Sequence, residues 1–145
     1  MTAHLKIQFV VADGSRARWV HRSEDAADDF TTTREMKAEH REPGHPQGMV
    51  FQSFGSQRFG VEEADEAVRR HRETFARAVA DEINAEASRD AFERLAIVAP
   101  SHTLAAITEH LNAAAKTRLV HTLAKDLGKT PDHELGGWLR HLELG

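Results

Sequence analysis

The feature that most constrains the fold is a pair of apolar segments joined by a tight turn near the start of the chain. Residues 5–12 first alternate between apolar and polar side chains and then become apolar at every position. The alternation predicts a strand with one covered face, and the continuous apolar end predicts a strand covered on both faces, as at the centre of a sheet. Asp13-Gly14 then predicts a hairpin turn. Residues 5–12 and 16–22 are therefore expected to pair and to open a sheet.

The pattern changes from strand-like to helix-like at Val61. Before this point, residues 31–39 contain several β-branched threonines and are expected to form a third strand. From Val61 to Ser88, apolar residues recur at spacings of three and four, which predicts one long amphipathic helix. His71 falls within this stripe and is expected to be a core histidine. The predicted stripe comprises Val61, Ala64, Val68, His71, Phe75, Val79 and Ile83.

The second half of the chain alternates short apolar segments with helical ones. Residues 94–99 and 118–123 are expected to be strands, with a helix at residues 103–115 between them. Such alternation indicates neighbouring parallel strands in an α/β layer. We therefore predict a single α/β domain over residues 1–145, with a mixed sheet and flanking helices. The expected helix caps are Ser101 or Thr103 for the first of these helices and Thr130, followed by Pro131, for the last.

Composition limits the classes of function. The 145 residues carry a net charge of −4, which argues against nucleic-acid binding by the whole surface but not against a local basic patch. The absence of cysteine excludes disulfides, thiolate metal sites and a cysteine nucleophile. The first six residues show no secretory signal pattern, and no apolar run approaches the ~20 residues of a membrane span. The expectation is a soluble, cytoplasmic protein without membrane contact.

Residues 41–60 are the longest stretch without a regular pattern. Two of the four prolines fall here among repeated glycines, so a long loop is expected. One interpretation is a flexible arm whose phenylalanines stack on bases and whose arginine contacts phosphate. The other is a surface loop whose phenylalanines pack back onto the core or onto a dimer partner. The expected partner-binding residues are Phe54, Gln57, Arg58 and Phe59.

Three landmarks in this order carry a family resemblance. They are the VVADGSRARW opening at residues 10–19, the LAIVAP segment at residues 95–100, and Lys125-Asp126-Leu127 shortly before the last predicted helix. Together they resemble the bacterial family called protein required for attachment to host cells, or host attachment proteins. The landmarks cover nearly the whole chain, and their ordered combination is more specific than any one of them.

That family is similar in turn to the middle domain of eukaryotic and archaeal peptide-chain release factors, an α/β domain of RNase H-like shape. In release factors, a Gly-Gly-Gln loop before a long helix promotes hydrolysis of peptidyl-tRNA. Gly55-Ser56-Gln57 occupies the corresponding place here. Ser56 resists the backbone torsions that a second glycine permits. The resemblance therefore favours contact with a partner over catalysis of peptide release.

Polar residues that follow the predicted strands form a second candidate site. In open α/β sheets, ligands bind outside the carboxyl ends of the strands. An RNase H-like nuclease would use Asp13 for Mg²⁺, but two-metal sites need several converging carboxylates. The structural alternative makes Asp13 a turn residue, Ser101 a helix cap, and Lys125 with the next residue a solvated pair. The residues expected to border this crevice are Asp13, Ser101, His102, Lys125 and Asp126.

The remaining motifs predict no cofactor. The ten histidines show no metal-binding spacing, and no P-loop, nucleophile elbow or dinucleotide fingerprint is present, so no metal is expected. The favoured function is a non-enzymatic binding module that contacts RNA, a ribosomal component or a protein partner through residues 41–60. Two alternatives stay open: a hydrolase that acts on peptidyl-tRNA through the Gln57 loop, and a homodimeric scaffold.

Overall fold

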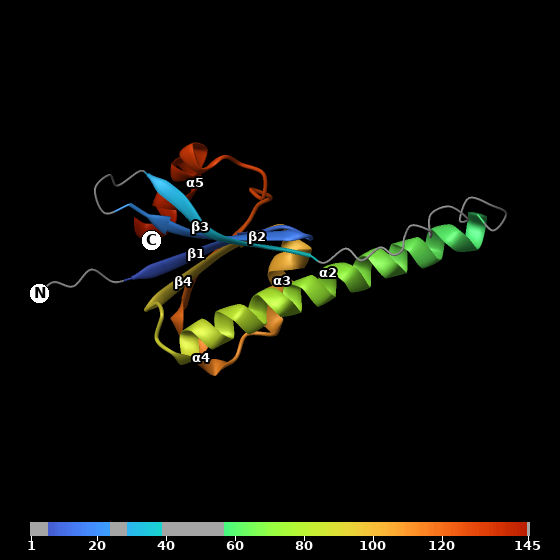
Figure 1. Cartoon of the computed structure of the whole chain (residues 1–145), viewed down its shortest axis with the longest axis horizontal. Helices are drawn as coiled ribbons and strands as arrows, with labels where there is room; N and C mark the ends of the chain where they lie inside the picture. Colours follow the sequence, from blue (N-terminus) through green and yellow to red (C-terminus); the bar gives the residue numbers. More distant parts are fainter. Residues whose placement is uncertain (1–5, 24–28, 39–56, 145) are drawn as a thin grey trace, which may run out of the picture.

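Five strands form one mixed sheet: β1 (Ile7–Ala12), β2 (Arg16–Arg22), β3 (Phe30–Lys37), β4 (Arg94–Ala99) and β5 (Leu119–Ala124). The computed structural model describes residues 6–23, 29–38 and 57–144, and the statements below concern these residues. The strand order is β3-β2-β1-β4-β5 (Figure 1). β1, β2 and β3 pair antiparallel in sequence order, whereas β4 runs parallel to both β1 and β5.

Helices cover both faces of this sheet. α2 (Gln57–Ser88), α3 (Ser101–Glu109) and α4 (Ala113–Arg118) lie on one face, and α5 (Asp132–Leu144) lies on the other (Figure 1). This arrangement confirms the predicted α/β domain with a mixed sheet and flanking helices. Each predicted strand agrees with the observed one to within two residues at either end.

Two apolar cores lie on opposite sides of the sheet. Val10 and Ala12 of β1 pack into the core beneath α2, whereas Phe9 and Val11 pack into the core beneath α5. All four side chains are buried. The end of β1 is apolar at every position because a central strand is covered on both faces.

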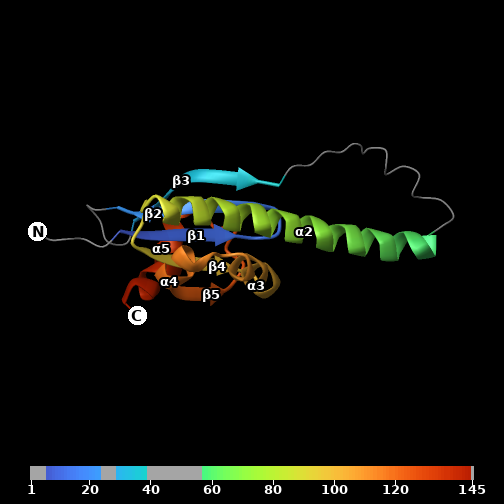
Figure 2. The same ribbon diagram turned by 90° about the horizontal axis from the view of Figure 1, so that it is seen from below.

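α2 is much longer than the strands that it crosses. Its 32 residues span about 48 Å, whereas the six residues of β1 span about 20 Å. The helix therefore projects beyond the sheet (Figure 2). Phe75, Val79 and Ile83 are buried in the sheet-facing core, as the stripe predicts. Val68 and His71 lie where α2 passes the β1–β2 turn and are exposed, so the predicted core position of His71 is wrong.

The helix predicted at residues 103–115 is two helices. α3 ends at Glu109 and α4 begins at Ala113. The Asn112 side chain caps α4, because its Oδ1 accepts a hydrogen bond from the backbone N–H of Ala115 at 2.9 Å. The predicted side-chain cap of α3 is wrong: its N-cap residue is Pro100, and no side chain accepts from its first N–H groups.

Two other helix starts differ from the predictions. α2 begins at Gln57 rather than Val61, so the last four residues of the predicted 41–60 loop are helical. α5 begins at Asp132, one residue after Pro131, which was the predicted start. Across the described ranges, no helix has the length and apolar character that crossing a bilayer requires.

Candidate functional site at the carboxyl edge of the sheet

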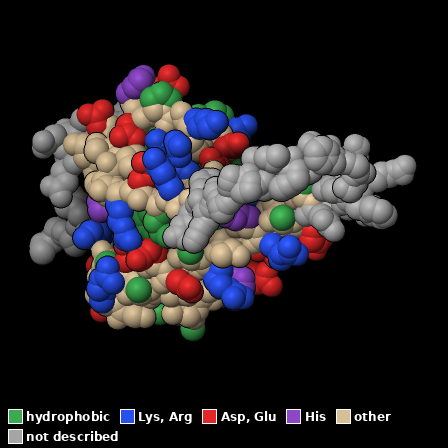
Figure 3. All heavy atoms as spheres, turned by 45° about the vertical axis from the view of Figure 1, so that its right-hand side comes forward, with side chains coloured by type: hydrophobic (Ala, Val, Ile, Leu, Met, Phe, Trp, Pro, Cys, Tyr) green, Lys and Arg blue, Asp and Glu red, His purple; other side chains and the backbone are tan. Residues whose placement is uncertain are grey.

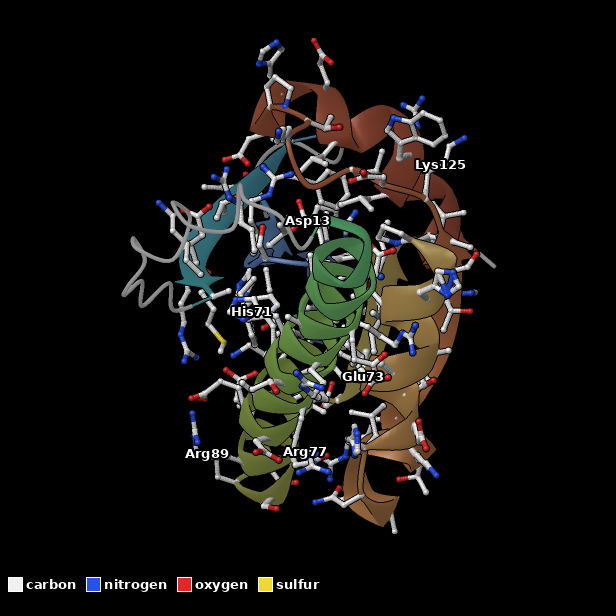
Figure 4. The ribbon with its side chains drawn as sticks, turned by 90° about the vertical axis from the view of Figure 1, so that its right-hand side faces the viewer. Asp13, His71, Glu73, Arg77, Arg89 and Lys125 are labelled. Atoms are coloured by element: carbon white, nitrogen blue, oxygen red, sulfur yellow. The ribbon has the colours of Figure 1, made fainter. Side chains whose placement is uncertain are left out.

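Three parallel strands end at the same edge of the sheet. β1, β4 and β5 run in one direction, so Asp13, Ser101 and Lys125 all lie along that edge. The backbone N–H of Lys125 donates to the carbonyl of Ala99, with an N···O distance of 3.0 Å. Open α/β sheets bind ligands at such an edge. Figure 4 views this edge with the projecting end of α2 toward the reader.

Asp13 is held by the turn between β1 and β2. Its Oδ1 accepts hydrogen bonds from the backbone N–H groups of Ser15 at 2.8 Å and Arg16 at 2.9 Å. A Cβ added at Gly128, in the connection between β5 and α5, would collide with the Asp13 carboxylate. This carboxylate is therefore already hydrogen-bonded and packed. The geometry favours the turn interpretation of Asp13 over a metal-binding one.

Gly14 lies close to α2. An added Cβ would lie 2.8 Å from Cδ of Arg72. None of the described glycines has a positive φ angle. The lack of a side chain at Gly14 therefore gives room for the nearby Arg72 side chain and is not needed for a left-handed backbone conformation. The Arg72 side chain therefore passes directly over the β1–β2 turn.

Lys125 and Asp126 each contact a different partner. The Lys125 ammonium lies 4.9 Å from the ring centroid of Trp138 on α5. Oδ1 of Asp126 accepts a hydrogen bond from the backbone N–H of Gly128 at 3.3 Å. Lys125 lies well to one side of Asp13 (Figure 4). These two residues therefore shape the connection between β5 and α5 and do not converge with Asp13 on one point.

A hollow of about 440 Å³ lies between α2 and the start of α3, and we call it the α2–α3 hollow. Glu73 points from α2 toward α3, whereas His71 points from the other side of the helix toward β3 (Figure 4). His102 was predicted at this edge from the sequence, but the two arginines were not. The lining residues are Arg69, Arg72, Glu73, His102, Thr103 and Ala106.

Arginines gather on the exposed part of α2. Every side chain from Ala64 to Thr74 is exposed, including those of Arg69, Arg70 and Arg72. Nη1 of Arg69 lies 3.7 Å from the Glu66 carboxylate, a long surface ion pair of little energetic weight. Figure 3 shows basic side chains in blue on this part of the helix. The three arginines cluster between residues 69 and 72, whereas the exposed segment from Ala64 to Thr74 as a whole balances them with three acidic residues, Asp65, Glu66 and Glu73.

A polar cluster of two buried side chains and one exposed arginine joins α2 to the sheet. The Glu86 carboxylate accepts hydrogen bonds from Nε1 of Trp19 at 2.8 Å and from Arg34 at 3.2 Å. The Arg34 guanidinium also lies 5.0 Å from the Trp19 ring centroid. These groups satisfy one another, so the cluster is a structural link between layers.

A second polar cluster joins α5 to the sheet through Asp132. Its carboxylate accepts hydrogen bonds from the Thr32 hydroxyl at 2.6 Å and the Thr32 backbone N–H at 2.9 Å. Arg18 approaches the same carboxylate at 3.4 Å. Burial raises the pKa of Asp132, but the Thr32 hydrogen bonds and the positive charges of Arg18 and His133 outweigh it, so the pKa lies below its ordinary value.

His21 is a partly buried histidine outside the carboxyl edge. Burial and then the positive charge of Lys6 lower its pKa, against an opposing effect of Glu86. Its Nε2 lies 3.0 Å from Oε1 of Gln8. Since the amide nitrogen of Gln8 donates to backbone carbonyls, this oxygen accepts and the Nε2 of His21 donates.

The predicted partner-binding residues lie at or beyond the limit of the described chain. Phe54 is outside the described residues. The backbone of Gln57, Arg58 and Phe59 forms the first turn of α2, while their side chains are outside the description. In the part of the chain that is described, no group of three His, Asp or Glu side chains is arranged to hold a metal ion.

Comparison with known proteins gives one family. The family model described as "Protein required for attachment to host cells" matches residues 8–139. These residues include β2 to β5, all of β1 except Ile7, and most of α5. A search of curated proteins gives no match.

Proposed function

The chain belongs to the family of proteins required for attachment to host cells, and from this premise we propose that it is a non-enzymatic binding module for RNA. Residues 41–60 and the exposed part of α2 that follows them make the contact. Ribosomal RNA is one source of such a ligand. A protein partner is the competing outcome that the experiment below separates from RNA.

The run of arginines on the exposed part of α2 carries this proposal. Arg69, Arg70 and Arg72 lie on the same continuous helix as the expected contact residues Gln57 and Phe59. Arginine is suited to phosphate, and phenylalanine stacks on unpaired bases. Acidic residues flank this short run of arginines on a chain of net charge −4, so we expect binding at a few defined phosphate positions rather than nonspecific binding along the whole surface.

Fluorescence anisotropy with a labelled single-stranded RNA of about ten nucleotides tests the proposal. We expect Arg69→Gln/Arg70→Gln/Arg72→Gln to weaken binding about tenfold or more and to reduce the salt slope by about two, since each lost phosphate contact removes about 0.7. The matched control is Arg89→Gln/Arg94→Gln/Lys116→Gln, which removes the same charge from exposed positions at the other end of the fold. Equal loss in both variants would contradict the assigned surface.

The expected contact residues before α2 are tested in the same assay. Phe54→Ala/Phe59→Ala should weaken binding by removing two stacking platforms, each worth about 1–3 kcal/mol. A pull-down from lysate with and without nuclease tests the competing possibility, a protein partner. Partners that stay bound after nuclease treatment, with no affinity for the labelled RNA, would show that the partner is a protein.

Gln57→Ala separates binding from hydrolysis. A binding module should keep its RNA affinity in this variant, because the proposal gives Gln57 no chemical role beyond one contact among several. If the protein released peptide from peptidyl-tRNA and Gln57→Ala abolished that release, the non-enzymatic assignment would be wrong.

A homodimeric scaffold is the second candidate, and the exposure of Val68 favours it. Val68 is 51 % exposed on α2 and borders the same surface hollow as Gly14 and Ser15 of the β1–β2 turn. Asp65 and Glu66 precede it and Arg69 and Arg70 follow it. Two copies packed antiparallel about Val68 therefore place acidic residues against basic ones in a self-complementary contact. A dimer in light scattering that Val68→Asp converts to a monomer would support this candidate.

A further inference from the structure

We infer that the α2–α3 hollow is a binding pocket for a phosphate group. Arg69 and Arg72 supply guanidinium groups from α2, and Thr103 with the first turn of α3 supplies hydrogen-bond donors from the other wall. If the ligand is the backbone of RNA, this inference rests on the proposed function. If the ligand is a free phosphate monoester, it does not. Both sources present the same phosphate chemistry.

The charge of the hollow favours an anion. Two guanidinium groups line it against one carboxylate, that of Glu73. The Arg72 side chain passes close to Gly14 on the β1–β2 turn, where an added Cβ would lie 2.8 Å from its Cδ. Binding of phosphate by Arg69 would break only the long ion pair that this residue forms with Glu66. Each planar guanidinium presents a fork of N–H donors that matches phosphate oxygens.

Thr103 provides an independent reason for a ligand. Its side chain lines the hollow, although the residue is only 6 % exposed. The hydroxyls of Thr108 and Thr117, in the same helical layer, donate to carbonyls three residues earlier at 3.1 and 3.0 Å. The Thr103 hydroxyl makes no such bond to any described residue. Buried hydroxyls are normally hydrogen-bonded, so this one calls for a partner from outside the chain.

The orientation of the Thr103 hydroxyl follows from its surroundings. Among the described residues, the one fully enclosed side-chain polar atom that lacks a hydrogen bond is Nε of Arg18. The unpaired oxygen of Thr103 is therefore not fully enclosed, and the open space that Thr103 borders is the hollow. A ligand in the hollow would therefore have this hydroxyl and the two arginines within one lining.

The start of α3 adds backbone donors on the same wall. Pro100 is the N-cap residue and cannot act as a side-chain cap, and no other side chain does so. The first backbone bond of the helix runs from Leu104 N–H to the Pro100 carbonyl at 2.8 Å. The N–H groups of His102 and Thr103 thus have no acceptor among the described residues. Such groups, with the helix dipole, favour an anion.

Several donors from different directions match phosphate better than a planar carboxylate. Two guanidinium groups, one hydroxyl and backbone N–H groups surround the space, and tetrahedral phosphate oxygens can accept from all of them. The volume of about 440 Å³ exceeds the need of the phosphate alone and lies within the range of small-molecule pockets. The ligand is therefore a phosphate group attached to a larger body, such as a nucleoside or an RNA strand.

Calorimetric titration of the intact chain with inorganic phosphate and with adenosine 5′-monophosphate tests the pocket. We expect saturable binding of both, tighter for the nucleotide, and none of adenosine alone. Arg69→Gln/Arg72→Gln should weaken phosphate binding about tenfold or more, since one lost charge-assisted bond is worth about a factor of ten. Thr103→Val, which keeps the shape and removes the hydroxyl, should weaken it several-fold, and Glu73→Gln should strengthen it.

Arg70→Gln/Arg77→Gln is the matched control. It removes the same charge from exposed positions on the same helix that do not line the hollow, and it should leave phosphate binding nearly unchanged. Equal weakening by the two double variants, or no saturable phosphate binding by the unmodified chain, would overturn the pocket. Thermal midpoints of all variants show that the fold is retained.

The labelled RNA separates the pocket from the proposed function. Phosphate binding that depends on Arg69 and Arg72, without any RNA binding, would support the pocket and overturn the RNA proposal. RNA binding that both double variants weaken equally, without saturable phosphate binding, would keep the RNA proposal and overturn the pocket. Competition of free phosphate with RNA, lost in Arg69→Gln/Arg72→Gln, would assign the pocket to the RNA backbone.

Discussion

At the scale of single residues, one helical stripe of α2 joins the core to the surface. Phe75 is 5 % exposed, whereas Val68, two turns earlier on the same stripe, is 51 % exposed. Phe75→Ala should lower the free energy of unfolding by about 3–5 kcal/mol, because it removes a buried ring and leaves a cavity. Val68→Ala should change it by no more than about 0.5 kcal/mol. Urea denaturation of both variants measures the difference, and similar values would show that α2 packs differently from its observed position.

A second residue prediction concerns acid stability. The folded pKa of Asp132 lies below its ordinary value because Thr32, Arg18 and His133 together outweigh burial. A lowered folded pKa contributes stability above the unfolded pKa, and this contribution is lost as the pH falls below about 4. Asp132→Asn should therefore lose less stability between pH 7 and pH 3 than the unmodified chain, as measured by urea denaturation at each pH. Equal losses would show that the carboxylate is not stabilised in the folded state.

At the scale of elements, Asn84 of α2 fixes the break between α3 and α4. Its Nδ2 donates to the carbonyl of His110 at 3.1 Å, and its Oδ1 accepts from the backbone N–H of Asn112 at 2.9 Å. Asn84→Ala leaves both backbone groups without this partner and should lower the free energy of unfolding by about 1–3 kcal/mol. The exposed neighbour Asp81 offers a control, since Asp81→Ala should change stability by about 0.5 kcal/mol or less. Similar effects of the two changes would exclude Asn84 as a link between the helices.

This link explains why local patterns predicted the strands but not the break. β2 and β4 have the predicted bounds because the Asp13-Gly14-Ser15 turn precedes β2, and the continuous apolar run of β4 ends at Pro100. Residues 103–115 contain neither proline nor glycine, so nothing local ends a helix there. The break depends on Asn84, which lies more than 25 residues earlier in the chain. Asn112 was a visible signal, since asparagine is a preferred N-cap residue.

The candidate site, too, was only partly predictable from local sequence patterns. Its edge of the sheet was predictable, because parallel strands bring the residues after them together, and the turn role of Asp13 followed from Asp13-Gly14. The α2–α3 hollow was not predictable, because the sequence does not say where the sheet stops beneath α2. For the same reason, His71 was wrongly predicted to be a core residue. Arg69 and Arg72 are recognised as lining residues only once α2 and α3 are packed together.

At the scale of the whole molecule, both apolar cores share one sheet, and this predicts a single unfolding transition. Trp19 is buried in the core beneath α2, whereas Leu139 of α5 is buried in the core on the other face. β1 contributes alternate residues to both cores, so neither can be lost without exposing the other face of the same strand.

Trp138→Phe leaves Trp19 as the sole tryptophan, since the chain has two, and its fluorescence then reports the α2 side alone. In this background, Leu139→Ala should lower the free energy of unfolding by about 2–5 kcal/mol. We expect Trp19 fluorescence and far-ultraviolet circular dichroism to show the same lowered midpoint, although the substitution lies across the sheet from Trp19. The control is Trp138→Phe alone, in which the two signals should also coincide at a higher denaturant concentration. If Leu139→Ala shifted the circular dichroism midpoint while the Trp19 transition stayed in place, α5 would unfold separately, and the two layers would not form one cooperative unit.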